Sequence, residues 1–492
     1  MDPAALTRRR HRATRILQPI IRAYALGYLS STTPKVVSCL RRLWSNNGLS
    51  LQEKLRELLQ ALTGAIRLES FPTFCASVIG GSTLLPLLVL RALQAAYRRV
   101  GSNPTNLNSK EVSRLIQFAT TFFSAWFSFQ ILNRKPVSLQ HVYKGIPDGT
   151  SRETTINEPR NNPHSRPEFS GRTMDLTLFT LTRALDSLVC ISWSWGQKKR
   201  KSNSRWGAAA DTVVPRLGDS AVFAASAAVV MWAWFYIPER LPKSYRKWID
   251  EVAKVDDRLV EALRRARRSI FVYGKETGQA PLLESMCKDY GWPLEWGDPK
   301  KTIPIPCEMV HMGCGPSCES HAVSRFVRTF KFACATYIPL QIAFRFRSIK
   351  SMSSLRRAVS DALRSSSFLA SFVSIFYYSV CLSRTRLGPR IFGKETVTPQ
   401  MWDSGLCVGA GCVMCGWSIL VEHAKKRQEI ALFVAPRAAA TVLPRFYDKK
   451  YQRRERAAFA ISAAVLLTCF RECPEMVRGV FGRIGRSIVN PS

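Results

Sequence analysis

The residues with the most distinctive chemistry lie between Cys307 and His321. Three cysteines and two histidines occur there in the spacing C-x3-H-x2-C-x3-C-x2-H: Cys307, His311, Cys314, Cys318 and His321. Thiolate sulfur and imidazole nitrogen are the ligands of tetrahedral zinc sites, and such short intervals let neighbouring ligands converge. The stretch is compatible with a zinc site, a disulfide or a reduced structural corner, and Gly315-Pro316, which is typical of the start of a helix, favours the structural corner.

The cysteines outside this stretch do not extend the pattern. Six of them lie in or at the edge of apolar segments, where a free cysteine behaves as a small hydrophobic residue: Cys75, Cys190, Cys381, Cys407, Cys412 and Cys415. Their surroundings disfavour a disulfide framework. We expect no cofactor, and zinc is the alternative.

No group of side chains in the sequence suggests catalysis. Residues 388–394 approximate a phosphate-binding loop, but Glu395 stands where such a loop needs a hydroxyl group for magnesium, and its charge would repel phosphates. No convergent acid, base and nucleophile is apparent elsewhere. We therefore expect no catalytic residues and no enzymatic activity, with a membrane-embedded enzyme as an alternative.

Five apolar runs in the sequence determine the expected fold class. Each is 18 to 20 residues long and free of Asp, Glu, Lys, Arg and His: 71–90, 115–132, 220–238, 365–383 and 404–421. A helix of that length covers roughly 27 to 30 Å, which matches the hydrocarbon thickness of a bilayer. The sequence predicts an all-α, polytopic helical membrane protein, and core helices of a large soluble protein are the alternative.

The charge of the chain fits a membrane surface. The 72 Lys and Arg residues outnumber the 35 Asp and Glu residues, which gives a net charge of +37. The basic residues are spread along the loops between apolar runs, and no common nucleic-acid-binding signature is present. Anionic lipid head groups are the expected partners, and nucleic acid is not.

An internal repeat relates the two parts of the chain. FAASAAVV from Phe223 matches FAISAAVL from Phe459, and residues 175–184 match residues 429–438 in the same order. A duplicated unit explains this self-similarity, so the weaker apolar stretches 174–196, 430–443 and 457–470 are expected to span as well. The sequence then predicts two repeated four-helix halves, 67–238 and 331–474. The short stretch 332–344 is not decided by length.

The repeat also places charges within the presumed bilayer. Asp175 and Arg183 correspond to Glu429 and Arg437, each pair eight residues apart, or about 12 Å along a helix. An isolated ion at mid-membrane is costly, so these side chains are expected to line a polar groove between the halves. The alternative is that their helices lie flat in the membrane interface.

Small residues in the apolar runs favour close helix packing. Gly80 and Gly81 lie in the first run, and Gly405 with Gly409 forms a small-xxx-small spacing in the fifth. Such faces let membrane helices approach closely, so these four glycines are expected at helix contacts.

The remaining segments are polar or amphipathic. Residues 1–66 are basic, with Leu17, Ile20, Ile21, Tyr24 and Tyr28 at helical spacing, which favours a surface amphipathic helix over a cleaved targeting segment. We expect a flexible loop at 133–172, an extramembrane connector at 239–330 and a basic tail at 475–492.

Three stretches together resemble the transmembrane protein 135 family, especially its fungal members. These are PCEMVHMGCGPSCESHAVSRF (306–326), MWAWFYIPERLPKSYRKWI (231–249) and LGYLSSTTPK from Leu26. The first is similar to the family's cysteine-rich domain, so the resemblance extends to Cys307, His311 and Cys318. The family is distantly similar to the mitochondrial inner-membrane translocase and small peroxisomal membrane proteins. The resemblance implies a multi-pass protein of peroxisomal or mitochondrial membranes, with a role in membrane organisation, division, or lipid and protein trafficking, and with other organelle membrane proteins as partners.

A zinc-dependent, membrane-anchored interaction module is the alternative function.

Overall fold

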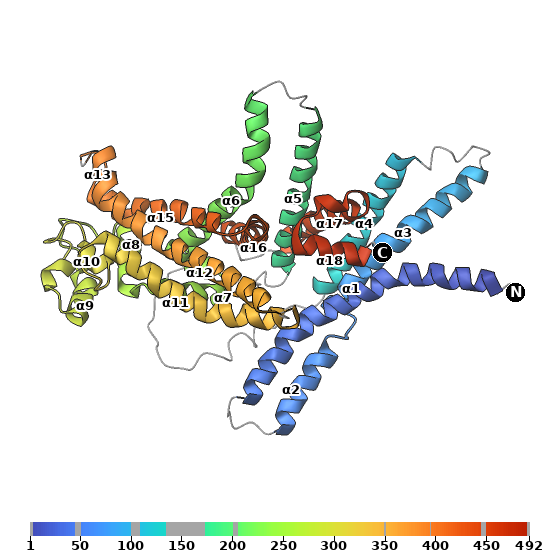
Figure 1. Ribbon diagram of the computed structural model, residues 1–492, viewed down its shortest axis with the longest axis horizontal. Coiled ribbons are helices and arrows are strands. Elements are labelled where there is room, and N and C mark those ends of the chain that lie inside the picture. The colour runs from blue at the N-terminus through green and yellow to red at the C-terminus, as the bar shows by residue number, and fades with distance from the viewer. Residues whose placement is uncertain are drawn as a thin grey trace. The chain divides into compact units, whose positions relative to one another are not determined.

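The computed structural model describes residues 3–44, 51–99, 109–133, 173–199, 205–348, 351–393, 395–443 and 449–489. In these ranges the chain forms helices and turns but no strand, which confirms the expected all-α class (Figure 1). The loop expected at 133–172 lies outside the described residues apart from Asn133, the last residue of a helix.

Five helical stretches in the described part of the chain are long and apolar enough to cross a membrane. They are Phe71–Arg99, Lys110–Leu132, Asp211–Tyr236, Met352–Ile391 and Pro399–Val421. Each contains or nearly coincides with one of the five predicted apolar runs. A span of the hydrocarbon core takes about 20 apolar residues, so all five are compatible with a membrane protein.

The weaker apolar stretches are also helical, but none of them reaches the same length and apolarity. They lie in α5 (Thr173–Lys199), α11 (Cys318–Arg345), α16 (Ala424–Val442) and α17 (Lys449–Glu472). That these helices cross the bilayer stays a prediction.

The chain divides into two compact units, and the first contains Met1–Lys199 and Arg445–Ser492. Its helices are α1 (Pro3–Trp44), α2 (Leu51–Gly64), α3 (Phe71–Arg99), α4 (Lys110–Asn133), α5, α17 and α18 (Gly479–Val489). Helix α17 packs against both α4 and α5, and α3 packs against α4 and α1. The core of this unit includes the rings of Phe74, Phe129 and Phe459.

The second unit contains Arg200–Pro444. Its longer helices are α6 (Arg205–Tyr236), α11, α12 (Met352–Cys381), α15 (Cys407–Cys415) and α16. Helix α6 packs on α15 and α16, and α12 packs on α11 and α15. The connector adds α7 (Lys243–Ala253), α8 (Asp257–Arg267), α9 (Ala280–Tyr290) and α10 (Cys307–Val310). Helices α9 and α10 gather at one end of the α11–α12 pair (Figure 1).

Two π-helical turns interrupt this second unit. One, Leu382–Arg386, follows α12 and leads into α13 (Leu387–Ile391). The other, Trp402–Leu406, joins α14 (Pro399–Met401) to α15. Single π-turns inside helices are frequent at functional sites, because they redirect the side chains that follow.

The compact units do not coincide with the two halves expected from the sequence. Helix α6 closes the first half, 67–238, but belongs to the second unit, and α17 closes the second half, 331–474, but belongs to the first. Each unit thus combines three apolar helices of one half with the fourth helix of the other.

The four glycines expected at helix contacts have different surroundings. A Cβ at Gly81 would lie 2.0 Å from the Ser124 hydroxyl oxygen of α4, and one at Gly80 would lie 3.4 Å from Ile20 of α1. Gly405 is in the π-turn with φ 143°, outside helical geometry, and Gly409 meets only Trp232, at 3.7 Å. A Cβ at Gly405 would still lie 2.8 Å from a guanidinium nitrogen of Arg267 and 3.3 Å from the Trp232 ring, so this glycine lies at a helix contact. Two further close approaches in the same run are at Gly411, 2.9 Å from Phe376, and at Gly416, 2.5 Å from Ala224. Gly411 and Gly416 thus allow close packing at positions that the sequence did not single out, whereas Gly409 lies in more open surroundings.

The amphipathic stripe expected on the N-terminal helix is only partly buried. Leu17 and Ile21 are exposed, whereas Pro19, Ala23 and Gly27 are buried one turn apart along α1. A Cβ at Gly27 would lie 2.9 Å from the Cα atom of Pro72, so small residues allow α1 to pack closely on α3.

Candidate metal centre and apolar pocket

The predicted cysteine and histidine cluster lies where α10 ends and α11 begins. Three residues of the intervening turn, Met312, Gly313 and Gly315, have positive φ, which reverses the chain within a few residues. Ser317 then caps α11, because its hydroxyl oxygen accepts a hydrogen bond from the backbone N–H of Ser320 at 3.2 Å. The reversal brings the start of α10 next to the start of α11.

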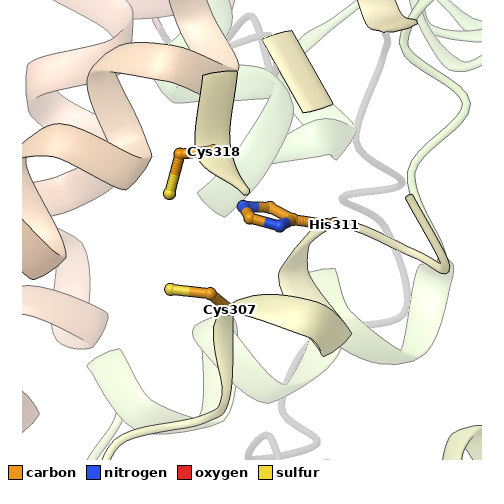
Figure 2. A group of neighbouring side chains, drawn as sticks. All are labelled: Cys307, His311 and Cys318. Carbon is orange, nitrogen blue, oxygen red and sulfur yellow. The ribbon is translucent and has the colours of Figure 1, made fainter. Parts of the chain in front are cut away.

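Three of the five predicted ligands come together as a result. The ligand atoms of Cys307, His311 and Cys318 all lie within 4.8 Å of one another. Figure 2 shows the two sulfur atoms and the imidazole ring facing a common space. His311 is fully buried and Cys318 nearly so, so this space is shielded from solvent.

The other two predicted ligands have different roles. The Cys314 thiol lies 3.7 Å from the hydroxyl oxygen of Ser324 and is not part of the cluster. The ring of His321 stacks on that of His311, with 4.6 Å between centroids and 17° between planes. It also meets the ring of Tyr377 edge-on at 5.1 Å. His321 therefore supports the His311 ring by packing rather than by ligation.

Burial favours neutral side chains in this cluster. It raises the pKa of the Cys307 thiol, and it lowers the pKa of His311. Burial, reinforced by the charge of Arg325, lowers the pKa of His321 to about 3. Both imidazole rings are consequently neutral near pH 7, which is the form in which histidine binds metals.

The thiol of Cys381, at the end of α12, was not predicted as part of this site. The Nε2 atom of His311 lies 3.4 Å from its sulfur atom. From the sequence, Cys381 is expected to behave as a small hydrophobic residue, because it lies near the end of an apolar run far from the motif. Only its position beside the basic residues Arg384 and Arg386 distinguishes it in the sequence.

The four charges expected to line one groove are distributed over two units. Asp175 and Arg183 are on α5 in the first unit, and Glu429 and Arg437 are on α16 in the second. Asp175 is exposed, whereas Arg183 is buried and its guanidinium lies over the ring of Phe179, with 5.4 Å to the centroid. A common groove stays a prediction, and each arginine instead contacts aromatic rings of its own unit.

The second unit contains an apolar pocket with a volume of about 400 Å³. Its lining comes from α6, α7, α11, α12 and α16, and includes Phe223, Tyr245, Phe372 and Phe433. Arg437 lies at the edge of this pocket, since its guanidinium carbon is 3.6 Å from the centroid of the Phe433 ring and 5.9 Å from that of Tyr245. Burial raises the pKa of Tyr245 despite this nearby positive charge, so its phenol group is neutral.

Comparisons of the chain with protein-family models, curated proteins and solved structures find no match. The resemblance to the transmembrane protein 135 family therefore stays a prediction from the sequence motifs.

Proposed function

We propose that this chain is a non-enzymatic, multi-pass membrane protein that binds and handles lipid in peroxisomal or mitochondrial membranes. The five apolar helices support residence in a membrane. The choice of organelle rests on the resemblance of residues 306–326 and 231–249 to the transmembrane protein 135 family.

The observation that carries lipid binding is the apolar pocket with Arg437 at its edge. A volume of about 400 Å³ falls within the range of roughly 300–1,000 Å³ that is usual for small-molecule sites. Aliphatic and aromatic side chains suit an acyl chain, and a guanidinium beside them suits a phosphate group. The occupant we propose is an anionic phospholipid with one acyl chain in the pocket.

We further propose that the two units arose from one duplicated four-helix unit whose last helix was exchanged. Phe223 and Phe459 begin the matching sequences of α6 and α17, and both are buried. Phe223 lies edge-on to Phe368 of α12, and Phe459 contacts Phe74 of α3. Since α3 and α12 open their respective halves, the matching phenylalanines contact matching helices.

The elements that follow α6 and α17 support the same relationship. Each helix ends in a short 3-10 turn, Pro238–Arg240 or Pro474–Met476, and an amphipathic helix follows, α7 or α18. The residues before these turns have nearly the same backbone angles: Ile237 has φ −140° and ψ 56°, and Cys473 has φ −137° and ψ 61°.

The arginines of the repeat have matching aromatic partners. Arg183 contacts Phe179, four residues earlier, and Phe481 of α18. Arg437 contacts Phe433, four residues earlier, and Tyr245 of α7. Tyr245 follows Phe223 by twenty-two residues, as Phe481 follows Phe459. An arginine held between two rings is thus a shared feature of both units, and in the second unit it lies beside the pocket.

Photocrosslinking of the detergent-purified chain tests lipid binding. Two probes are used, an anionic and a zwitterionic phospholipid, each with a photoactivatable group on an acyl chain. We expect crosslinks on peptides of α6, α7, α12 and α16, and a loss of these crosslinks when Ala227→Phe fills the pocket. The control Val222→Phe, on an exposed face of α6, leaves them unchanged.

The head-group preference tests the role of Arg437. Arg437→Gln is expected to lower the preference for the anionic probe by about fivefold, which is the effect of one basic residue near a lipid surface. Lys425→Gln, on an exposed position of the same helix, is the matched control. Crosslinks spread evenly over all lipid-facing helices, or unaffected by Ala227→Phe, would contradict the proposal.

The organelle is tested separately, by imaging a tagged copy against peroxisomal and mitochondrial markers. Resistance to alkaline carbonate extraction is expected of an integral membrane protein. Release of the chain into the supernatant would exclude a multi-pass protein, whatever the pocket binds.

A further inference from the structure

We propose that Cys307, His311, Cys318 and Cys381 form a four-ligand zinc site that fastens the extramembrane connector to the end of α12. This inference does not depend on lipid binding. It goes beyond the sequence motif, because the fourth ligand comes from a different helix and two of the motif's own candidates are left out.

The separation of the ligand atoms of His311 and Cys381 fits a tetrahedral zinc ion. With Zn–S of about 2.3 Å and Zn–N of about 2.0–2.1 Å, a nitrogen and a sulfur ligand lie roughly 3.5 Å apart, and two sulfur ligands roughly 3.8 Å. The distance from His311 Nε2 to Cys381 Sγ is 3.4 Å. The ligand atoms of Cys307, His311 and Cys318 lie within 4.8 Å of one another. Binding of the ion would draw the sulfur ligands closer together, to the separations given above.

The hydrogen bond made by the other ring nitrogen orients His311 for ligation. Its Nδ1 atom lies 2.7 Å from the carbonyl oxygen of Gly315. A carbonyl accepts only, so Nδ1 carries the proton and Nε2 presents its lone pair toward Cys381. Zinc-bound histidines almost always donate their second ring N–H in this way, which fixes the tautomer. Gly315 has φ +84°, so the turn that supplies this carbonyl depends on its glycine.

The polar groups around the cluster suit a zinc–thiolate centre. Three thiolates and one zinc ion carry a net charge of −1. Arg384 lies three residues after Cys381 and is buried. Its Nη1 atom has no hydrogen-bond partner in the described part of the chain. A buried N–H donor near metal-bound sulfur is a typical second-sphere partner.

A zinc ion at this position would join three parts of the second unit. Cys307 begins α10, Cys318 begins α11 and Cys381 ends α12. Ser374 of α12 already donates a hydrogen bond to the carbonyl oxygen of Ala322 in α11, at 2.8 Å. The metal would add a second link between α11 and α12, and it would also join the connector to the end of α12. The donor set of three thiolates and one imidazole is one of the usual structural zinc sets.

Metal analysis of the full-length chain, purified in detergent under reducing conditions, tests the site. We expect about one zinc ion per chain, and loss of the zinc in Cys307→Ser, Cys318→Ser and Cys381→Ser. Cys314→Ser is the matched control and keeps the metal, because its thiol lies outside the cluster. Absence of zinc from the wild-type chain, or full retention by Cys381→Ser, would overturn the proposal.

X-ray absorption spectroscopy of the wild-type protein provides a second test that does not depend on folding of the variants. The proposal requires a first shell of three sulfur atoms and one nitrogen atom. A shell of two sulfur atoms and two nitrogen atoms would place His321 at the metal and exclude Cys381. An additional measurement is the rate at which Cys381 is alkylated. We expect this rate to rise after a chelator removes the metal, and an unchanged rate would contradict the proposal.

Discussion

Arg384 and Asp403 form a bidentate ion pair inside the second unit, and almost none of either side chain is exposed. The distance from Arg384 Nε to Asp403 Oδ1 is 2.5 Å, and that from Nη2 to Oδ2 is 2.8 Å. Their side chains are 4% and 1% exposed. Each residue lies in one of the two π-turns, and Tyr273 of the connector donates a hydrogen bond to the same carboxylate. The pair thus links both π-turns to the connector.

Removing one partner of this pair should strongly destabilise the second unit. Asp403→Asn leaves a buried guanidinium without its counter-charge, a change that typically costs about 3–5 kcal/mol. The double variant Arg384→Met with Asp403→Leu removes both charges and should be much closer to the wild type. Thermal unfolding of the detergent-purified protein measures the difference.

An exposed ion pair nearby provides the control. Arg386 and Glu319 are about half exposed, so Glu319→Gln should leave the unfolding temperature nearly unchanged. Equal changes in unfolding temperature for Glu319→Gln and Asp403→Asn would show that the Arg384–Asp403 pair stabilises the protein no more than an exposed pair does.

The features predicted correctly from the sequence are local ones. The length and apolarity of a run are properties of consecutive residues, so all five candidate spans could be identified without the fold. Cys307, His311 and Cys318 could be grouped because one short turn determines how they meet.

The features that were missed depend on packing between distant segments. Cys381 reaches His311 only because α12 packs along α11, and no spacing rule relates positions seventy residues apart. The pairing of Arg384 with Asp403 likewise depends on two π-turns, and no sequence pattern predicts these turns. The placement of α6 and α17 in opposite units also depends on packing. The repeat shows that the two helices match each other, but it does not show which helices each one packs against.

Gly409 and Gly416, both in the apolar run 404–421, should differ in their tolerance of a methyl group. A Cβ at Gly416 would lie 2.5 Å from the Cα atom of Ala224, and backbone cannot move aside easily. Gly416→Ala is therefore expected to destabilise the protein by about 1–3 kcal/mol. A Cβ at Gly409 would contact only Trp232, at 3.7 Å, so Gly409→Ala should be tolerated. Thermal unfolding compares the two variants, and equal sensitivity would contradict the close contact between Gly416 and Ala224 of α6.

The aromatic contact between α4 and α17 can be measured by a double-mutant cycle. The rings of Phe129 and Phe459 are stacked with 4.8 Å between centroids, and both are buried. Phe129→Leu and Phe459→Leu should show a coupling of about 0.5–1.5 kcal/mol in unfolding experiments. Phe127, on an exposed position of α4, is the control and should show additive effects with Phe459. Additivity of Phe129 and Phe459 would argue against the assignment of α17 to the first unit.

The carboxylate of Asp256 should make part of the protein's stability depend on pH. It caps α8 by accepting a hydrogen bond from the backbone N–H of Arg258 at 2.9 Å, and the guanidinium of Arg258 donates two more. These side-chain hydrogen bonds hold the pKa of Asp256 below its ordinary value, against the opposing effect of burial. A lowered pKa in the folded state means that the stabilisation is complete above the unfolded pKa of about 4, and is lost as the pH falls through the folded value.

Asp256→Asn separates this charge from the capping role, because asparagine caps helices about as well as aspartate. Above pH 5 the wild type should be more stable than the variant by about 1 kcal/mol, the usual contribution of a partly exposed ion pair. The difference should shrink toward zero as the pH is lowered below 4. Thermal unfolding of both proteins across this range measures it. A difference that stays constant with pH would mean that Arg258 does not stabilise the ionised form of Asp256.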